Sequence, residues 1–254
     1  MDLIDTHCHL DDASFDADRA GVLARCGQAG VRRIVVPGVT ATGWDNLLRL
    51  CGEQEGLYPA LGLHPMYLEQ HRPGDVRQLA EQIEQHHPLA IGEIGLDYYI
   101  ENPDQAQQES LLYEQLEIAR QAQLPVLLHC RKAHDRILKA LREVPVPGGI
   151  AHAFNGSLQQ AHQYIELGFK LGFGGMLTYE RSSKLRKLAR ELPLEAIVLE
   201  TDAPDMTVAS HRGERNSPEY LPECLAALAE VRNGEPDELA CQTTRNAETV
   251  LGLG

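Results

Sequence analysis

Two histidines stand one residue apart near the N-terminus, at His7 and His9. In a β-strand, residues two positions apart point to the same side, so both imidazoles can face one metal ion while Cys8 faces away. The motif by itself is equally typical of two histidines that cap a loop. A metal site therefore requires further ligands elsewhere in the chain.

Further ionisable residues lie inside or directly after short apolar segments. Glu93 lies within the apolar segment Ile91–Leu96, where a buried carboxylate is costly unless a cation or hydrogen-bond donors compensate it. His129, His152 and Asp202 each follow such a segment closely. We expect Glu93 to bridge two metal ions with its two oxygens. A salt bridge to an arginine is the alternative for this carboxylate.

The elements that must position these residues are eight short apolar segments that alternate with helical patterns. The predicted strands are Leu3–Ile4, Ile34–Val36, Leu57–Leu63, Leu89–Leu96, Pro125–Leu128, Gly149–Ala153, Phe169–Phe173 and Ile197–Leu199. Leucines at helical spacing predict helices over Gln105–Gln123 and Ser182–Glu191. Eight β-then-α units fit either an open doubly wound sheet or a closed barrel.

The positions of the ionisable residues favour the closed barrel. They fall within the fourth predicted strand and at the ends of the first, fifth, sixth and eighth. In an open sheet the first and last strands lie far apart, whereas a barrel brings all the carboxyl ends to one rim. We therefore predict an α/β protein with a single domain, residues 1–254, folded as a TIM-type β/α barrel.

Composition limits the location and the partners of this chain. The sequence has no apolar stretch near the roughly 18 residues that a membrane span needs, and its N-terminus does not resemble a secretory signal. The six cysteines form no C-x-x-C pair and are interpreted as reduced thiols. We expect a cytoplasmic monomer without an obligate protein partner. The net charge of −14 argues against a broadly basic nucleic-acid surface, so any polyanion would be held locally.

Several motifs together resemble the TatD family of metal-dependent deoxyribonucleases, and within it the YjjV-like branch. They are Asp5-Thr6-His7-Cys8-His9, Gly62-Leu63-His64-Pro65, Gly92-Glu93-Ile94-Gly95-Leu96-Asp97, His129-Cys130-Arg131, His152-Ala153-Phe154, Glu200-Thr201-Asp202-Ala203-Pro204, Arg215-Asn216-Ser217-Pro218 and Thr244-Arg245-Asn246-Ala247. The resemblance runs almost end to end. It implies a distorted barrel of the amidohydrolase type, two divalent metal ions and hydrolysis of phosphodiester bonds in DNA.

The expected metal ligands divide between two ions according to barrel order. One ion is assigned His7, His9, Glu93 and Asp202, and the other is assigned Glu93, His129 and His152. Asp202 is also expected to accept a proton from the nucleophilic water, so Glu93 and Asp202 count as catalytic residues. Mixed nitrogen and oxygen ligands suit zinc or manganese, while the resemblance suggests magnesium.

Other residues are candidates for contact with the substrate. His64 is expected to act in catalysis or to bind a phosphate oxygen or the leaving group, and Arg131 could bind phosphate oxygens with its guanidinium fork. The resemblance adds Asn216 as a substrate contact. Tyr98 and Tyr99 could stack on bases, although packing is the commoner role for such tyrosines. The remaining histidines, including His134, are expected to be solvated.

Three functions fit these observations. The leading hypothesis is a metal-dependent deoxyribonuclease with an exonucleolytic mode. The alternative is a hydrolase of a carbonyl ester or amide, such as a small metabolite or the ester of a mischarged D-aminoacyl-tRNA, because the same type of site can attack a carbonyl carbon. A metal-binding or interaction module without catalysis is the third, and activity abolished by Glu93→Ala with the fold retained would count against it.

Overall fold

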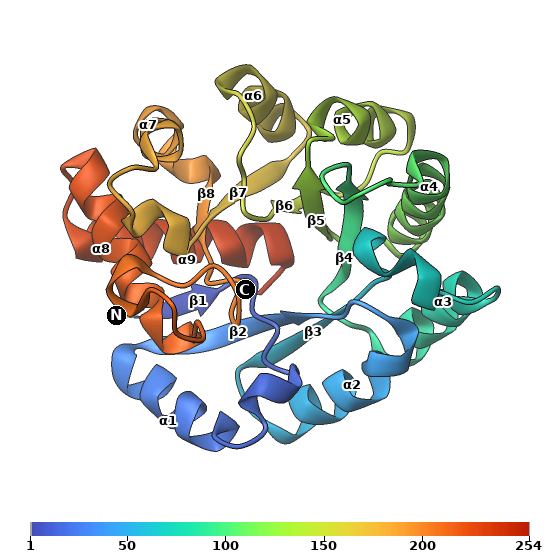
Figure 1. Cartoon of the computed structure of the whole chain (residues 1–254), viewed down its shortest axis with the longest axis horizontal. Coiled ribbons are helices and arrows are strands. Elements are labelled where there is room, and N and C mark those ends of the chain that lie inside the picture. The colour runs from blue at the N-terminus through green and yellow to red at the C-terminus, as the bar shows by residue number, and fades with distance from the viewer. Residues whose placement is uncertain (1, 254) are drawn as a thin grey trace.

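The computed structural model describes residues 2–253, in which eight parallel strands form a ring and helices surround it (Figure 1). The strands are β1 (Leu3–Asp5), β2 (Val31–Pro37), β3 (Leu57–Leu61), β4 (Ala90–Asp97), β5 (Val126–Arg131), β6 (Gly149–Ala151), β7 (Phe169–Phe173) and β8 (Ile197–Leu199). Each strand pairs with the next one along the chain. The predicted eight-stranded β/α barrel is thereby confirmed.

The helices follow the strands and pack their apolar sides against them. They are α1 (Arg19–Ala29), α2 (Trp44–Glu53), α3 (Asp75–His86), α4 (Gln105–Ala122), α5 (His134–Glu143), α6 (Leu158–Glu166), α7 (Ser183–Glu191), α8 (Leu221–Arg232) and α9 (Pro236–Leu251). Short 3₁₀ helices lie in the loops, at Ala13–Phe15, Ala41–Gly43, Pro65–Gln70, Gly175–Thr178, Leu194–Ala196, Ala209–His211 and Pro218–Tyr220. Within residues 2–253, every helix is too short or too polar to cross a membrane.

Two apolar cores follow from the alternation of side chains along the strands. The larger one lies between the strands and the surrounding helices. The smaller one fills the barrel interior with Ile4, Val35, Ala60, Ala90, Leu127, Ile150, Val198, Ala247 and Leu251. Asn246 of α9 donates hydrogen bonds to the carbonyl oxygens of Leu194 and Ile197, both at 2.7 Å, at the start of β8. Helix α9 therefore packs at the amino-terminal end of the barrel, and the opposite rim is left for polar residues.

The barrel is distorted at the seam between β1 and β8. Among the described strands this pair forms no ladder. The Thr6 amide and hydroxyl instead donate to the Leu199 carbonyl oxygen, at 3.1 and 3.0 Å. The Thr201 amide and hydroxyl donate to the Asp5 carboxylate, at 3.0 and 2.5 Å. Backbone and side-chain hydrogen bonds together thus join β1 and β8 where the regular ladder is interrupted.

Two glycines allow β7 to lie close to the loop after β8. A Cβ atom on Gly172 would come within 2.1 Å of Glu200 Oε2, and one on Gly175 within 2.2 Å of the Met206 carbonyl oxygen. Only a residue without a side chain fits at such distances. The glycines therefore allow close backbone packing beside the rim.

Candidate metal centre

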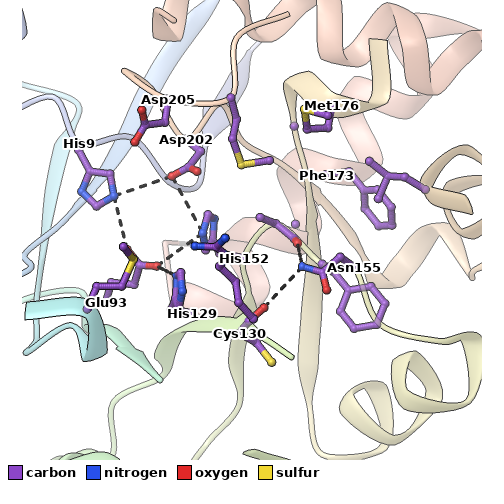
Figure 2. Close-up of a pocket in the computed structure, with 18 of the residues that line it drawn as sticks. His9, Glu93, His129, Cys130, His152, Asn155, Phe173, Met176, Asp202 and Asp205 are labelled. Carbon is purple, nitrogen blue, oxygen red and sulfur yellow. Dashed lines mark hydrogen bonds and ion pairs between the residues drawn. The ribbon is translucent and has the colours of Figure 1, made fainter. Parts of the chain in front are cut away.

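The predicted metal ligands converge at the carboxyl-terminal rim of the barrel (Figure 2). His7 Nε2 lies 3.1 Å and His9 Nε2 3.4 Å from Glu93 Oε2. Asp202 Oδ1 lies 3.7 and 3.8 Å from the same two nitrogens. Ligands about 2.1 Å from a tetrahedral metal ion lie roughly 3.4 Å from one another. These four side chains therefore fit one divalent cation.

The second oxygen of Glu93 faces a different set of imidazoles. Oε1 lies 2.9 Å from His129 Nδ1, 3.3 Å from His64 Nε2 and 3.5 Å from His152 Nε2. His152 Nε2 also lies 4.0 Å from Asp202 Oδ1, so the two sets are adjacent. The Glu93 carboxylate, only 2% exposed, therefore stands between two groups of donor atoms.

His64 differs from the other histidines in the use of its two ring nitrogens. Its Nδ1 accepts a hydrogen bond of 3.1 Å from the Met66 amide, which can only donate. The neutral ring therefore carries its proton on Nε2, the atom that points toward Glu93. A protonated nitrogen donates a hydrogen bond and does not bind a cation. This tautomer leaves Nε2 of His64 as a hydrogen-bond donor at the candidate metal centre.

Two buried carboxylates that sequence reasoning did not assign lie behind the histidines. Asp97 Oδ2 is 2.9 Å from His129 Nε2, and Glu200 Oε1 is 3.4 Å from His152 Nδ1. Such outer partners fix the tautomer and orientation of ligating histidines. A signal was present for Asp97, because it lies four residues after Glu93 on β4 and therefore points to the same side.

Burial and neighbouring charges set the protonation of the two proposed catalytic carboxylates. Burial acts to raise the pKa of Glu93, but His64, His7 and His152 together hold it well below its ordinary value. Burial raises the pKa of Asp202 to about 6, against the opposing effect of His152 and His9. Asp202 is therefore better suited than Glu93 to take up a proton near neutral pH.

Asn216 lies beneath the loop that carries Asp202 and is fully buried. Its Nδ2 donates to the carbonyl oxygens of Thr201 and Asp205, at 2.8 and 2.6 Å, and its Oδ1 accepts from the Ser217 amide at 2.9 Å. This placement differs from the expected substrate contact, because all of its polar atoms are used by the protein. Asn216 holds the loop in shape.

Arg131 lies at the rim, on the same side of β5 as His129. Its Nη1 is 3.2 Å from Asp97 Oδ2, and its guanidinium lies 4.4 Å from the centre of the Tyr99 ring. The Tyr99 ring is 58% exposed, whereas the Tyr98 hydroxyl donates to Glu109 at 2.6 Å. Of the two tyrosines proposed to stack on bases, only Tyr99 presents an exposed ring.

The expectation that His134 is solvated is wrong. This residue begins α5 and is only 8% exposed. Its Nδ1 lies 3.3 Å from the Tyr164 hydroxyl and its Nε2 3.2 Å from Asn155 Oδ1. Its ring supports the loop after β6. The position of His134 at the start of a helix did not predict this burial.

A pocket of about 970 Å³ opens above the metal centre. Figure 2 shows His9, Asp202 and Asp205 on one side of His152, with Phe173 and Met176 on the other. The candidate ligands line one part of this pocket, and apolar side chains from β7 and the following loop line another. The space is large enough for a drug-sized or nucleotide-sized ligand.

Comparisons with known proteins agree with this arrangement. The model of the family described as TatD related DNase matches residues 4–252. The uncharacterized metal-dependent hydrolase YjjV of Escherichia coli K12 is 42% identical, with 98% of each chain covered. Its crystal structure superposes with a TM-score of 0.96 over 99% of this chain and 98% of that one, at 41% identity. The 3'-5' ssDNA/RNA exonuclease TatD of Salmonella typhimurium is 33% identical, with 98% of each chain covered. This chain belongs to the TatD family and is a metal-dependent hydrolase.

Proposed function

We propose that the chain is a deoxyribonuclease that hydrolyses phosphodiester bonds exonucleolytically, with two divalent cations at its site. The observation that carries this proposal is the Glu93 carboxylate, whose two oxygens face separate sets of imidazoles at the floor of a nucleotide-sized pocket. The name of the Salmonella relative adds support, since it describes a nuclease. We also propose that the protein is a cytoplasmic monomer.

The residues present fit the two cations. Glu93 would lie between them, with one cation held by His7, His9 and Asp202 and the other by His129 and His152. Buried imidazole nitrogens and carboxylate oxygens are donors that suit zinc, manganese or magnesium. When bound, such cations lower the pKa of water and stabilise negative charge that develops on an attacked phosphoryl group.

The chain's own residues supply the remaining steps of the hydrolysis. Asp202 accepts a proton from the attacking water, because its pKa of about 6 allows uptake near neutral pH. His64 donates through Nε2 to a phosphate oxygen or the leaving oxygen. Arg131 places its guanidinium fork where phosphate oxygens can bind it. Asp97 holds the ring of His129 in position through a hydrogen bond, and the Glu200 carboxylate lies 3.4 Å behind the ring of His152.

A hydrolase of a carbonyl ester or amide is the second candidate. The acidic side chains of Asp11, Asp12 and Asp205 line part of the pocket, and the whole chain carries a net charge of −14. These charges oppose the approach of a polyanion and favour a small or uncharged substrate. An ester or amide of a metabolite, or of a mischarged tRNA, would use the same cations and the same proton acceptor.

The decisive experiment measures cleavage of 5'-labelled and 3'-labelled single-stranded DNA with magnesium, manganese or zinc. We expect stepwise shortening from one end that EDTA abolishes and that Glu93→Ala lowers at least a thousandfold. Glu114→Ala, an exposed change on α4, is the matched control and should cleave as the wild type does. Intact DNA with bound metal demonstrated by elemental analysis would contradict the proposal and favour carbonyl substrates.

A further inference from the structure

The pocket above the metal centre has an acidic part and a basic part. Asp11 and Asp12 follow β1, and Asp205 follows β8, so the acidic part lies near the β1–β8 seam. Figure 2 shows Asp205 beside Asp202 and far from Asn155. The basic part contains Arg181 and Lys184, which lie before and within the first turn of α7.

Arg181 and Lys184 lack acidic partners. Lys184 Nζ donates to the Asn155 carbonyl oxygen at 2.6 Å, and the Arg181 guanidinium lies 5.6 Å from the centre of the Tyr179 ring. Within residues 2–253, neither side chain forms an ion pair with a carboxylate. The next cation along the helix, Arg186, does form one with Glu230. Two unpaired cations in one pocket of an acidic protein indicate an anionic ligand.

An apolar wall lines the same pocket as the candidate metal ligands and these cations. Phe173 ends β7 and is buried beneath the wall at 1% exposed, whereas Met176, from the loop after β7, is partly exposed and Met206 comes from the loop after β8. Met206 is 37% exposed, which is unusual for a large apolar side chain in this protein. Thioether groups provide a polarisable surface against which a nucleobase can pack regardless of its identity.

We propose that the β7–α7 side of the pocket is a nucleotide subsite, in which Met176 and Met206 hold a nucleobase and Arg181 and Lys184 bind its neighbouring phosphate. The proposal rests on the proposed nuclease function. The nucleotide would be the one next to the scissile phosphate. Because the opposite part of the pocket is acidic, the polynucleotide backbone extends from the metal centre on the basic side only.

The phosphate part of the subsite is tested by Arg181→Gln/Lys184→Gln. The matched control is Lys187→Gln/Arg190→Gln, which removes the same charge from exposed positions of α7 outside the pocket. We expect kcat/KM on a single-stranded oligonucleotide to fall at least tenfold in the first variant only. The salt dependence of KM should weaken by about 0.7 in log–log slope, because the two side chains bind one phosphate and each lost phosphate contact removes about 0.7. Hydrolysis of methyl 4-nitrophenyl phosphate, which has no second phosphate, should change less than twofold.

Binding of the same labelled oligonucleotide, measured by fluorescence anisotropy, separates this subsite from the nuclease function. A wild type that binds but does not cleave, with binding lost in Arg181→Gln/Lys184→Gln, would refute the nuclease and retain the subsite. Equal affinity and equal salt slopes in wild type, variant and control would overturn the subsite even if DNA is cleaved. A wild type that does not bind the oligonucleotide would overturn it as well.

The base part of the subsite is tested with an oligonucleotide that carries one abasic nucleotide next to the scissile bond. We expect wild-type protein to cleave it at least tenfold more slowly than the intact strand. The exposed change Met206→Ala should reduce that ratio without loss of thermal stability. Equal rates on both strands with the wild type would show that no base is held at this wall.

Discussion

The Asp5 carboxylate accepts hydrogen bonds from both the amide and the hydroxyl of Thr201, at 3.0 and 2.5 Å, across the seam between β1 and β8. The same carboxylate accepts a hydrogen bond of 3.2 Å from the His7 amide. One side chain thus connects the segment after β1, which carries His7, to the loop that carries Asp202. The position of two proposed metal ligands depends on this link across an interrupted ladder.

Thr201→Val is therefore expected to lower both stability and metal affinity. The change leaves a buried Asp5 oxygen without its donor, which costs about 1–3 kcal/mol of the free energy of unfolding. Metal affinity should fall about tenfold because His7 and Asp202 lose their common support. Urea unfolding and isothermal titration calorimetry measure the two effects. Thr249→Val on α9 is the control, and unchanged metal affinity in Thr201→Val would refute the link.

Asp97→Asn is expected to weaken metal binding while the fold is retained. The Asp97 carboxylate lies 2.9 Å from His129 Nε2, and loss of such an outer partner typically costs 10–100-fold in affinity or activity. Titration with zinc or manganese checks the affinity, and circular dichroism checks the fold. The control is Asp237→Asn on the exposed start of α9. An affinity equal to that of wild type would show that His129 is oriented without Asp97.

Asn216→Ala is expected to lower stability more than it alters substrate binding. The substitution leaves the carbonyl oxygens of Thr201 and Asp205 without a donor, at a cost of about 1–3 kcal/mol. Thermal unfolding measured in the presence of EDTA reports this loss independently of metal. A variant with wild-type stability but a raised KM would instead support a direct contact between Asn216 and substrate.

His134 is expected to make stability fall as pH decreases. Burial lowers the pKa of His134, with a further lowering by Lys184 and opposing effects of Asn155 and Asp135. Below about pH 6.5 the unfolded chain binds a proton that the folded ring resists, so folding loses up to about 1.4 kcal/mol per pH unit. Urea unfolding between pH 7.5 and 5 should show a steeper decline for wild type than for His134→Gln. Parallel curves would contradict this role.

Much of the barrel could be predicted because its signals are local. Apolar segments predicted the eight strands, and the predicted helix Gln105–Gln123 nearly coincides with α4. Both predictions were possible because the type and spacing of neighbouring residues indicate strands and helices. The convergence of the proposed ligands followed from one geometric fact, that a closed barrel gathers all carboxyl ends at a single rim. Residue chemistry and strand order were sufficient for that inference.

The partners of individual side chains depended on tertiary structure. Asp97 behind His129, Glu200 behind His152 and the burial of Asn216 each involve residues brought together by strand register and loop path. Polar contacts of this kind form over about 3 Å between residues that lie many positions apart in the sequence. The spacing of apolar residues along the chain therefore does not predict them. The sequence by itself determined the barrel and the chemistry available at its rim. Only the tertiary structure decided which polar groups reach the pocket and which support the site from behind. The reason is that this depends on whether each group is buried or exposed to solvent in the folded chain.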